Sequence, residues 1–167
     1  KHVVILDVFV ISSGFMLRIL AGTIGLGVLA SEWLLFCGFM ITLFLGFTKR
    51  YSEINLSIME NQSKTNTVTR KVLDDYSVQL LSQFISVTSA STILAYGMYT
   101  VAPQTIALHG SSDLIFTLPL VTYGIFRYLF LVFKRSSGND AAKEILNDWH
   151  IVIVSLFWGI SVLIILS

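Results

Sequence analysis

Five long apolar segments constrain this 167-residue chain more than any other feature of its sequence. About 20 apolar residues of α-helix cross a bilayer, and a helix satisfies its own backbone polar groups there. Apolar residues make up 54% of the chain and charged residues 13%, well below the charged share of soluble domains. The sequence therefore predicts an all-α membrane protein with a single transmembrane domain over residues 1–167. The five predicted helices are Val3–Val28, Trp33–Thr48, Val78–Val101, Leu114–Phe133 and Ile151–Leu166.

The eleven Lys and Arg residues are unevenly distributed among the connections between these helices. Five fall in Lys49–Ser77, three fall in Lys134–His150, and Lys1 precedes the first helix. The other two connections, Leu29–Glu32 and Ala102–Asp113, contain none. Because positive charge is retained on the cytoplasmic side, this alternation predicts a multi-pass protein of the cell (inner) membrane. Its chain would begin in the cytoplasm and end outside.

Three ionisable residues lie inside the predicted helices, where a charge is costly and usually has a partner or a function. Asp7 and Arg18 are too far apart to pair, at about 16 Å along the helix axis. Arg18 therefore either lines a cytoplasmic cavity that holds an anionic group or pairs with charges on other helices. Asp7 either faces that cavity or is hydrated at the interface. Arg127, about two turns before Lys134, either reaches the lipid headgroups or contributes to substrate binding.

Two cations and a carboxylate follow the second predicted helix, in the pattern Lys49-Arg50-x-x-Glu53. At a cytoplasmic boundary, the carboxylate could hold Mg²⁺ while the cations hold phosphate oxygens. The alternative is ordinary positive flanking charge, with Lys49 and Glu53 forming an ion pair if the helix continues. The residues by themselves leave both interpretations open.

The connection Lys49–Ser77 is long and polar, which is typical of a lid over a site. Near its end, Arg70 and Lys71 either bind phosphate or lipid headgroups, or simply flank the next helix. The chain has no Gly-rich nucleotide loop and no metalloprotease motif, and its three histidines lack metal-ligand spacing. We expect no nucleic-acid partner.

Six motifs spread over most of the chain occur together in a familiar order and spacing. They are Lys1-His2-x4-Asp7-Val8, Ile11-Ser12-x-Gly14-Phe15-x2-Arg18-x2-Ala21-Gly22, Leu45-Gly46-x2-Lys49-Arg50-x2-Glu53, Arg70-x-Val72-Leu73-x2-Tyr76-Ser77, Leu94-Ala95-Tyr96-x2-Tyr99 and Leu118-Pro119-x3-Tyr123-Gly124-x-Phe126-Arg127-Tyr128. Together they resemble the UbiA-type membrane prenyltransferase superfamily, and within it the branch of decaprenyl-phosphate phosphoribosyltransferases.

The resemblance implies a ring of nine membrane helices around a cavity open to the cytoplasm. This chain would match helices five to nine, so we expect N-terminal truncation and a partner in the missing N-terminal helices. Members that use prenyl diphosphates carry DxxxD in the second acidic motif. Here Lys49-x-x-x-Glu53 replaces one acid with a base, as in the phosphoribosyl branch. The first acidic motif would precede Lys1, so the fragment alone is expected to lack the main Mg²⁺ site and to be inactive.

The implied reaction is Mg²⁺-dependent transfer of 5-phosphoribosyl from phosphoribosyl diphosphate to polyprenyl (decaprenyl) phosphate, in the synthesis of cell-envelope polysaccharide precursors. Glu53 and Asp7 are the candidate catalytic residues, and Glu53 is also the candidate metal ligand. The candidate substrate-binding residues are Lys49, Arg50, Arg18, Arg70, Lys71 and Arg127. Two alternatives stay open: UbiA-type prenyl transfer to an aromatic acceptor, and a non-enzymatic transporter half.

Overall fold

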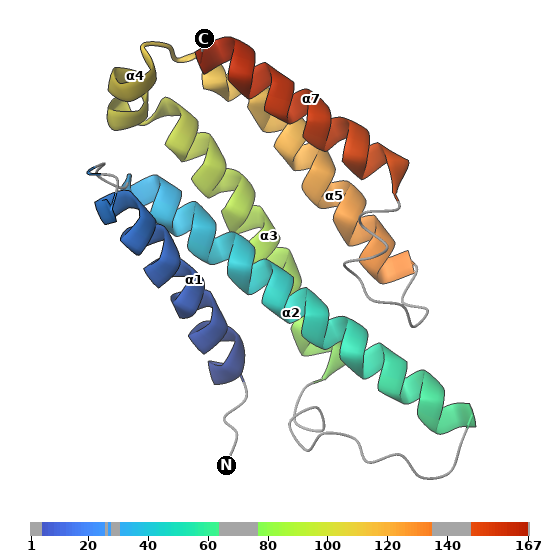
Figure 1. The fold of residues 1–167 in the computed structure, drawn as a ribbon. Helices are drawn as coiled ribbons and strands as arrows, with labels where there is room; N and C mark the ends of the chain where they lie inside the picture. The colour runs from blue at the N-terminus through green and yellow to red at the C-terminus, as the bar shows by residue number, and fades with distance from the viewer. Residues whose placement is uncertain (1–4, 26, 28–30, 64–76, 135–147, 167) are drawn as a thin grey trace.

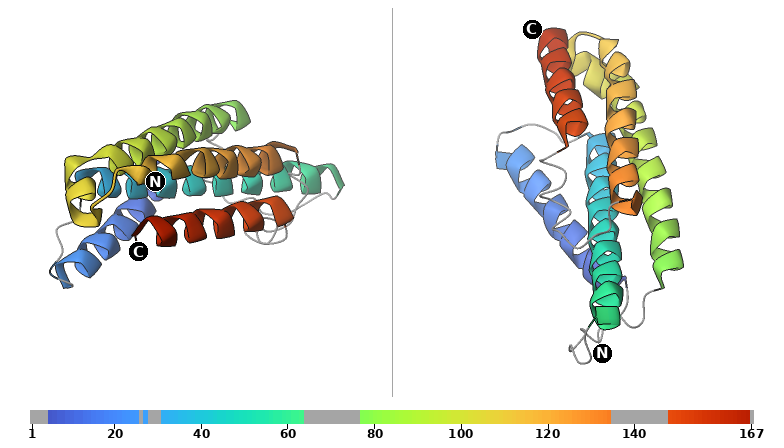
Figure 2. Two further views of the ribbon diagram at one scale, coloured as in Figure 1. Left: turned by 90° about the horizontal axis from the view of Figure 1, so that it is seen from above. Right: turned by 90° about the vertical axis from the view of Figure 1, so that its right-hand side faces the viewer.

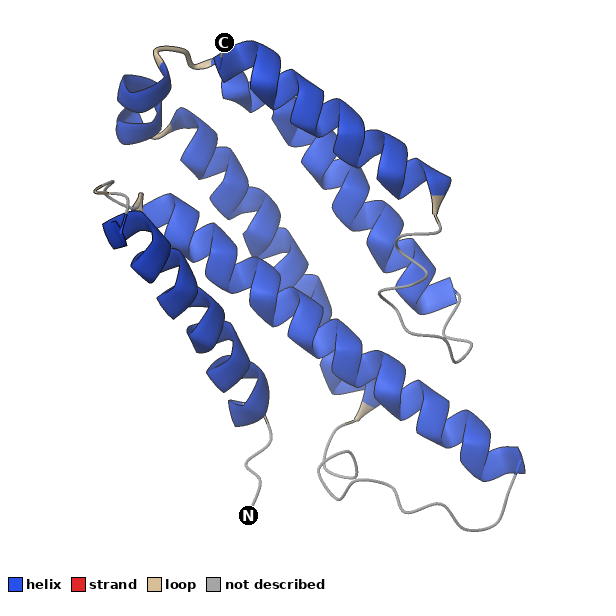
Figure 3. Ribbon diagram, viewed as in Figure 1, coloured by secondary structure: helices blue, strands red, loops and turns tan. Residues whose placement is uncertain are grey.

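The computed structural model describes residues 5–25, 27, 31–63, 77–134 and 148–166 (Figure 1). Every element in the described part is a helix, as Figure 3 shows. The elements are α1 (Leu6–Gly25), α2 (Glu32–Ser63), α3 (Val78–Val101), α4 (Pro103–His109), the 3-10 helix η1 (Asp113–Thr117), α5 (Leu118–Lys134) and α7 (Trp149–Leu166). Five helical spans are long and apolar enough to cross a membrane. The predicted class, an all-α membrane protein, is confirmed.

Helix α2 differs most from the boundaries expected from the sequence. We predicted that it would end at Thr48, but it continues to Ser63. The added segment, Lys49–Ser63, is polar but contains neither glycine nor proline, so nothing in it breaks a helix. The first part of the predicted lid is therefore a straight continuation of α2. The remainder, with Arg70 and Lys71, lies outside the described residues.

The connection between α3 and α5 is helical where we expected a loop. Pro103 begins α4, a position where its missing N–H group costs no hydrogen bond. Gly110 ends that helix with φ of 70°, which glycine adopts without strain. Together α4 and η1 keep this connection compact at the end of the bundle shown uppermost in Figure 1.

Helix α2 is the centre of the packing and lies between α1 and α3 (Figure 2). Helices α5 and α7 pack on each other, and α5 also meets α3. Aromatic pairs join α2 to its neighbours, with ring centroids 5.1–5.4 Å apart. These pairs are Phe44–Tyr128, Phe47–Phe84 and Tyr51–Phe133. Among the described residues, the hydrophobic core is therefore a cluster that runs along the middle of α2, where its buried members lie between Leu43 and Ile54.

Two glycines of α2 allow α1 to approach closely. A Cβ atom placed on Gly46 would lie 2.5 Å from Cγ1 of Val8, and one on Gly38 would lie 2.9 Å from Cδ1 of Ile19. Small residues at such positions are a common device for packing membrane helices, because they let the backbones approach. The α1–α2 contact consequently depends on the absence of side chains at these two positions.

Candidate active site

Three charged side chains meet where α1 begins and the membrane-spanning part of α2 is ending. The Arg50 guanidinium donates a hydrogen bond from Nε to Oδ2 of Asp7 at 2.8 Å, and its Nη2 lies 2.8 Å from the same oxygen. Its Nη1 donates a hydrogen bond to Oε2 of Glu53. The side chains of Arg50, Asp7 and Glu53 retain only 19%, 24% and 30% of their exposure. We call this group of three the Arg50 cluster.

The local sequence explains why these side chains converge. Arg50 and Glu53 are three residues apart on α2 and so share a helix face. Asp7 lies in the first turn of α1, where the helix dipole favours a carboxylate. Because α1 and α2 run in opposite directions (Figure 1), the contact of Val8 with Gly46 brings Asp7 beside Arg50, one turn further along α2.

The pairing within the cluster differs from one of the two sequence-based interpretations of this motif, the one with a Lys49–Glu53 ion pair. We expected Lys49 and Glu53 to form the ion pair if the helix continued, but Glu53 bonds to Arg50 instead. Lys49 is exposed on the neighbouring face of α2. Asp7 is not simply hydrated, since it accepts a hydrogen bond from a guanidinium on another helix. The only signal for this contact in the sequence was that Asp7 and Arg50 were both predicted near the cytoplasmic ends of their helices.

The cluster has a defined electrostatic character. Two carboxylates balance the charges of Arg50 and Lys49, and both bind Arg50. The two carboxylates thus hold the Arg50 guanidinium in place and neutralise its charge, whereas the Lys49 side chain is exposed at the surface. The arrangement can present one exposed ammonium group beside a fixed guanidinium, which suits binding of an anionic group.

The two carboxylates of the cluster supply only some of the ligands that Mg²⁺ needs. Mg²⁺ is usually held by one or two carboxylates together with substrate phosphates, and Asp7 and Glu53 both contact the Arg50 guanidinium, through different nitrogens. Within the described ranges, no group of three or more His, Cys, Asp or Glu side chains is gathered for a metal. The carboxylates therefore fit Mg²⁺ when a phosphate supplies the remaining oxygens.

Arg127 lies in a second ion pair, which shares no residue with the Arg50 cluster. Its Nη2 donates to Oδ2 of Asp148 at 2.8 Å and its Nε donates to Oδ1 at 3.2 Å. Asp148 is buried, and it also accepts a hydrogen bond from the backbone N–H of Ile151, in the first turn of α7. Arg127 thus ties α5 to the start of α7, a role that the sequence did not predict. The available signal was an aspartate just before the last apolar segment, which is a helix-capping position.

The Arg127 pair makes stability depend on pH in a defined direction. Hydrogen bonds from Arg127, and then from the Ile151 amide, lower the pKa of Asp148 below its ordinary value. A lowered pKa gives stability that is complete above about pH 4 and is lost as pH falls through the folded-state value. We expect the protein's Tm to exceed that of Asp148→Asn above pH 4, and the difference to shrink towards pH 3. A difference that stays constant over this range would contradict the pairing.

Of the other predicted site residues that the structure describes, neither Arg127 nor Arg18 joins the cluster. Arg18 is exposed, and its guanidinium carbon lies 5.0 Å from the centre of the Phe15 ring. Arg70 and Lys71 lie outside the described residues. The structure thus brings together Asp7, Arg50 and Glu53, with Lys49 adjacent, out of the eight residues predicted from the sequence.

These features describe a multi-pass helical membrane protein with a partly buried charged cluster at one end of its helices. Curated relatives match over 95% of this chain and are named decaprenyl-phosphate phosphoribosyltransferase. They come from Corynebacterium glutamicum (26% identity over 158 residues), Mycolicibacterium smegmatis (27% over 165) and Mycobacterium tuberculosis (27% over 158). The chain spans about half the length of these relatives: 46%, 50% and 49% respectively. No profile of a known protein family matches the sequence.

The matches confirm the resemblance inferred from the six motifs, and they support a transferase. They do so at low identity but over nearly the whole chain. The chain is therefore similar, over nearly its whole length, to one half of proteins named decaprenyl-phosphate phosphoribosyltransferase.

Proposed function

We propose that this chain is part of a membrane enzyme that transfers 5-phosphoribosyl from phosphoribosyl diphosphate to a polyprenyl (decaprenyl) phosphate. The observation that carries the proposal is the match, over 95% of the chain, to relatives bearing that name. Because the chain spans half of those relatives, the activity is proposed for the protein that combines it with the N-terminal helices expected before Lys1. We call this the complete protein, and we expect the chain alone to be inactive.

The proposed location is the cell (inner) membrane, with the Arg50 cluster on the cytoplasmic side. This orientation follows from the nine Lys and Arg residues in the connections and the chain start on that side, as the positive-inside rule requires. One proposed substrate is water-soluble and the other is a lipid, and both are anionic. A charged site where membrane-spanning helices meet the cytoplasm can receive both. A role in making cell-envelope polysaccharide precursors belongs to the same proposal.

The proposed reaction breaks the bond between the anomeric carbon and the diphosphate, and it forms a bond from that carbon to a phosphate oxygen of the lipid. Negative charge develops on the departing diphosphate, and fixed cations lower the barrier by stabilising it. Lys49 is exposed, and we assign it to binding these oxygens. Arg50 is already positioned, and it can turn Nη1 to a phosphate when Glu53 takes another partner. Mg²⁺, held by Glu53 with the substrate phosphates, would supply further charge neutralisation.

The remaining candidates keep different roles in the proposal. Asp7 orients Arg50 and can contact a ribose hydroxyl. Arg70 and Lys71 are proposed to bind phosphate from the lid segment, and Arg18 to face a cavity completed by the N-terminal helices. Arg127 is assigned to holding α7 rather than to substrate, because the Asp148 carboxylate bonds to two nitrogens of its guanidinium.

The test uses the complete protein in nanodiscs with radiolabelled phosphoribosyl diphosphate, a polyprenyl phosphate and Mg²⁺. We expect label in the lipid phase, and a fall of about 100-fold in Lys49→Ala and Glu53→Gln, since each removes one electrostatic contribution. Lys134→Ala is the matched control, because Lys134 is an exposed lysine at the same end of the helices.

Folded protein that leaves no label in the lipid would overturn the proposal. Prenylation of an aromatic acceptor in a parallel assay would then favour the related prenyl-transfer reaction. Substrate uptake into vesicles without chemical change would favour a transporter half.

A further inference from the structure

Arg18 is an exposed cation well inside an apolar helix. Along the axis of α1 it lies about 16 Å from Asp7 in the first turn and about 10 Å from Gly25 at the other end. Helical side chains lean towards the N-terminus of their helix, and the Arg18 guanidinium accordingly lies over the Phe15 ring, 5.0 Å from its centre. The charge thus leans towards the more distant end of the helix, a direction that disfavours snorkelling to the nearer interface.

The carboxylates of this chain are not placed to neutralise Arg18. Nine of its ten Asp and Glu residues fall in the four connections between the apolar segments, and the tenth, Asp7, binds Arg50. Among the described residues, the ion pairs are those of Arg50 and Arg127. A charge at this position in a membrane helix is costly without a partner, so the partner of Arg18 has to come from elsewhere.

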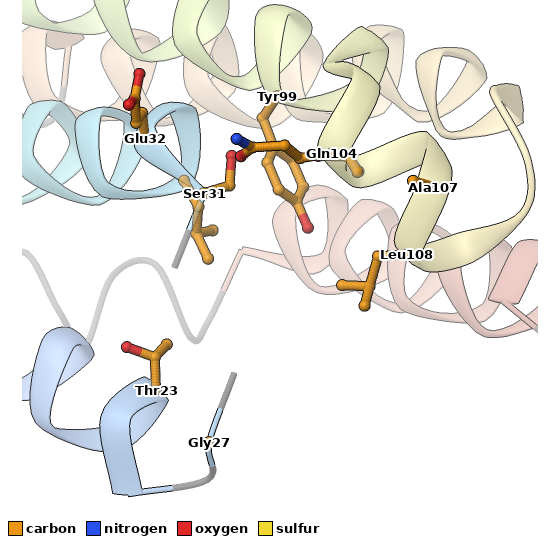
Figure 4. Close-up of a pocket in the computed structure, with 10 residues that line it drawn as sticks. Thr23, Gly27, Ser31, Glu32, Tyr99, Gln104, Ala107 and Leu108 are labelled. Carbon is orange, nitrogen blue, oxygen red and sulfur yellow. The ribbon is translucent and has the colours of Figure 1, made fainter. Parts of the chain in front are cut away.

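Glu32 lies at the end of the bundle where α1 finishes, but it does not supply this partner. It borders a pocket of about 790 Å³ to which Thr23 and Gly27 contribute from the end of α1 (Figure 4). Thr23 is about 140° around the helix from Arg18, so the pocket lies on the other side of α1. Figure 4 shows the Glu32 carboxylate directed away from Thr23 and Gly27.

Small residues surround Arg18 on its face of α1. Gly14 and Gly25, four residues before it and seven after it, share that face, and nothing lies within 4 Å of a Cβ atom at either. Ala21 and Gly22 flank the face on either side, so its margin already accepts a methyl group. Another exposed side of α1 carries large apolar residues suited to lipid, namely Leu6, Val10, Leu17 and Ile24. Small residues around a charge are instead typical of a surface on which a second membrane helix packs.

We propose that the face of α1 around Arg18 docks a membrane helix from the N-terminal part of the complete protein, and that a carboxylate on this helix binds Arg18. Charge selects the occupant, because an arginine at this position needs an anion and the glycines let a helix backbone approach closely enough to bring one. The chain spans about half the length of its curated relatives, so the complete protein has further sequence to supply that helix. The inference rests on the complete protein proposed above but not on its reaction.

The first measurement is the Tm of the complete protein in nanodiscs without substrates. Arg18→Leu should lower the Tm by at least about 5 °C, because it leaves the partner carboxylate unpaired inside the membrane. If Arg18 faced lipid, the same substitution would remove a costly charge and leave the Tm unchanged or raise it.

Gly14→Leu tests the close approach of the docked helix. The described residues leave open space at Gly14, and leucine is a better helix former than glycine, so a fall in Tm would have to come from the docked helix. We expect a fall similar to that of Arg18→Leu. Ser13→Leu is the matched control, since Ser13 is the preceding exposed residue and lies about 100° around the helix from Gly14. It should keep the Tm of the parent.

The second measurement identifies the carboxylate. The variant Arg18→Lys is treated with a membrane-soluble carbodiimide, which joins an amine and a carboxylate in contact as an amide. We expect mass spectrometry to map a link from position 18 to an Asp or Glu in a peptide that precedes Lys1. Ser13→Lys, treated in the same way, should give no such link.

Several results would overturn the proposal. They are an unchanged or raised Tm in Arg18→Leu, equal Tm values for Gly14→Leu and Ser13→Leu, and the absence of a link at position 18. A link between two copies of the protein would assign the face to self-association instead. None of these readouts uses transferase activity, so a folded complete protein that forms the link but transfers no phosphoribosyl group would reject the proposed function and support the docking.

Discussion

Replacing Arg50 with methionine is expected to lower the free energy of unfolding by about 2–4 kcal/mol. Arg50 is the shared partner of Asp7 and Glu53, so its loss leaves two partly buried carboxylates facing each other. Removing one member of a fully buried pair costs about 3–5 kcal/mol, and the residual exposure here reduces that value. The measurement is thermal and denaturant unfolding of the complete protein in nanodiscs.

Activity should respond more strongly than stability to the same substitution. A cation that is fixed before the substrate arrives stabilises developing charge without reorganisation, so we expect transferase activity to fall at least about 1,000-fold in Arg50→Met. Arg50→Lys should recover part of the stability but little activity, because an ammonium group cannot bond to both carboxylates in the same fork geometry.

A charge-free version of the cluster provides the control. The triple variant Asp7→Asn/Arg50→Met/Glu53→Gln removes the unpaired charges and should regain most of the lost stability, while remaining inactive. If Arg50→Met were as stable as the parent, the ion pairs between Arg50 and the two carboxylates would not be structural. If the triple variant kept full activity, the cluster would not belong to the active site.

Introducing valine at Gly46 is expected to cost about 3 kcal/mol, at the upper end of the usual range for overpacking. Even a Cβ atom at this position would lie 2.5 Å from Cγ1 of Val8, which is only 1% exposed and has a short, stiff side chain. Helix α1 must therefore move away from α2. Because Asp7 precedes Val8, the displacement should also lengthen the contact with Arg50 and reduce activity.

Gly22→Ala is the matched control, since nothing lies within 4 Å of a Cβ atom at Gly22. Alanine in a helix interior is favoured over glycine by about 0.5–1 kcal/mol, so this variant should be as stable as the parent or slightly more so. Adding Val8→Ala to Gly46→Val should restore part of the packing. The close approach of α1 to α2 would be disproved if Gly46→Val unfolded no more easily than Gly22→Ala.

The number of membrane helices was predictable because it depends only on the length of apolar segments and on what separates them. The end of helix α2 was not predictable. The change to polar residues at Lys49 marks the end of the apolar, membrane-spanning part, but the helix itself continues beyond it. Neither glycine nor proline interrupts the segment after Lys49, and local propensity then carries the helix on to Ser63. Helix α4 was not predicted for the same reason: it is a short helix in a connection that is not long and apolar enough to be recognised as a membrane helix, and we expected a loop there.

The candidate site was predictable in its residues but not in its pairings. Charge and position along the chain identified Asp7, Arg50, Glu53 and Arg127 as unusual, because ionisable groups are rare near apolar spans. Asp7 and Arg50, which pair with each other, are 43 residues apart in the sequence. Asp148, the partner of Arg127, follows it by 21 residues. Helix periodicity places side chains on a face of their own helix, but it does not say which helix faces them.

The sequence by itself therefore determined the membrane-helix class, the charged end of the helices and the motifs shared with phosphoribosyltransferases. These follow from composition, hydropathy and residue order, which act locally along the chain. Only the tertiary structure decided that Arg50 is held by two carboxylates and that Arg127 secures α7. Those contacts depend on how closely the helices approach each other. Between α1 and α2, the distance between the helices is small because Gly46 has no side chain where it meets Val8.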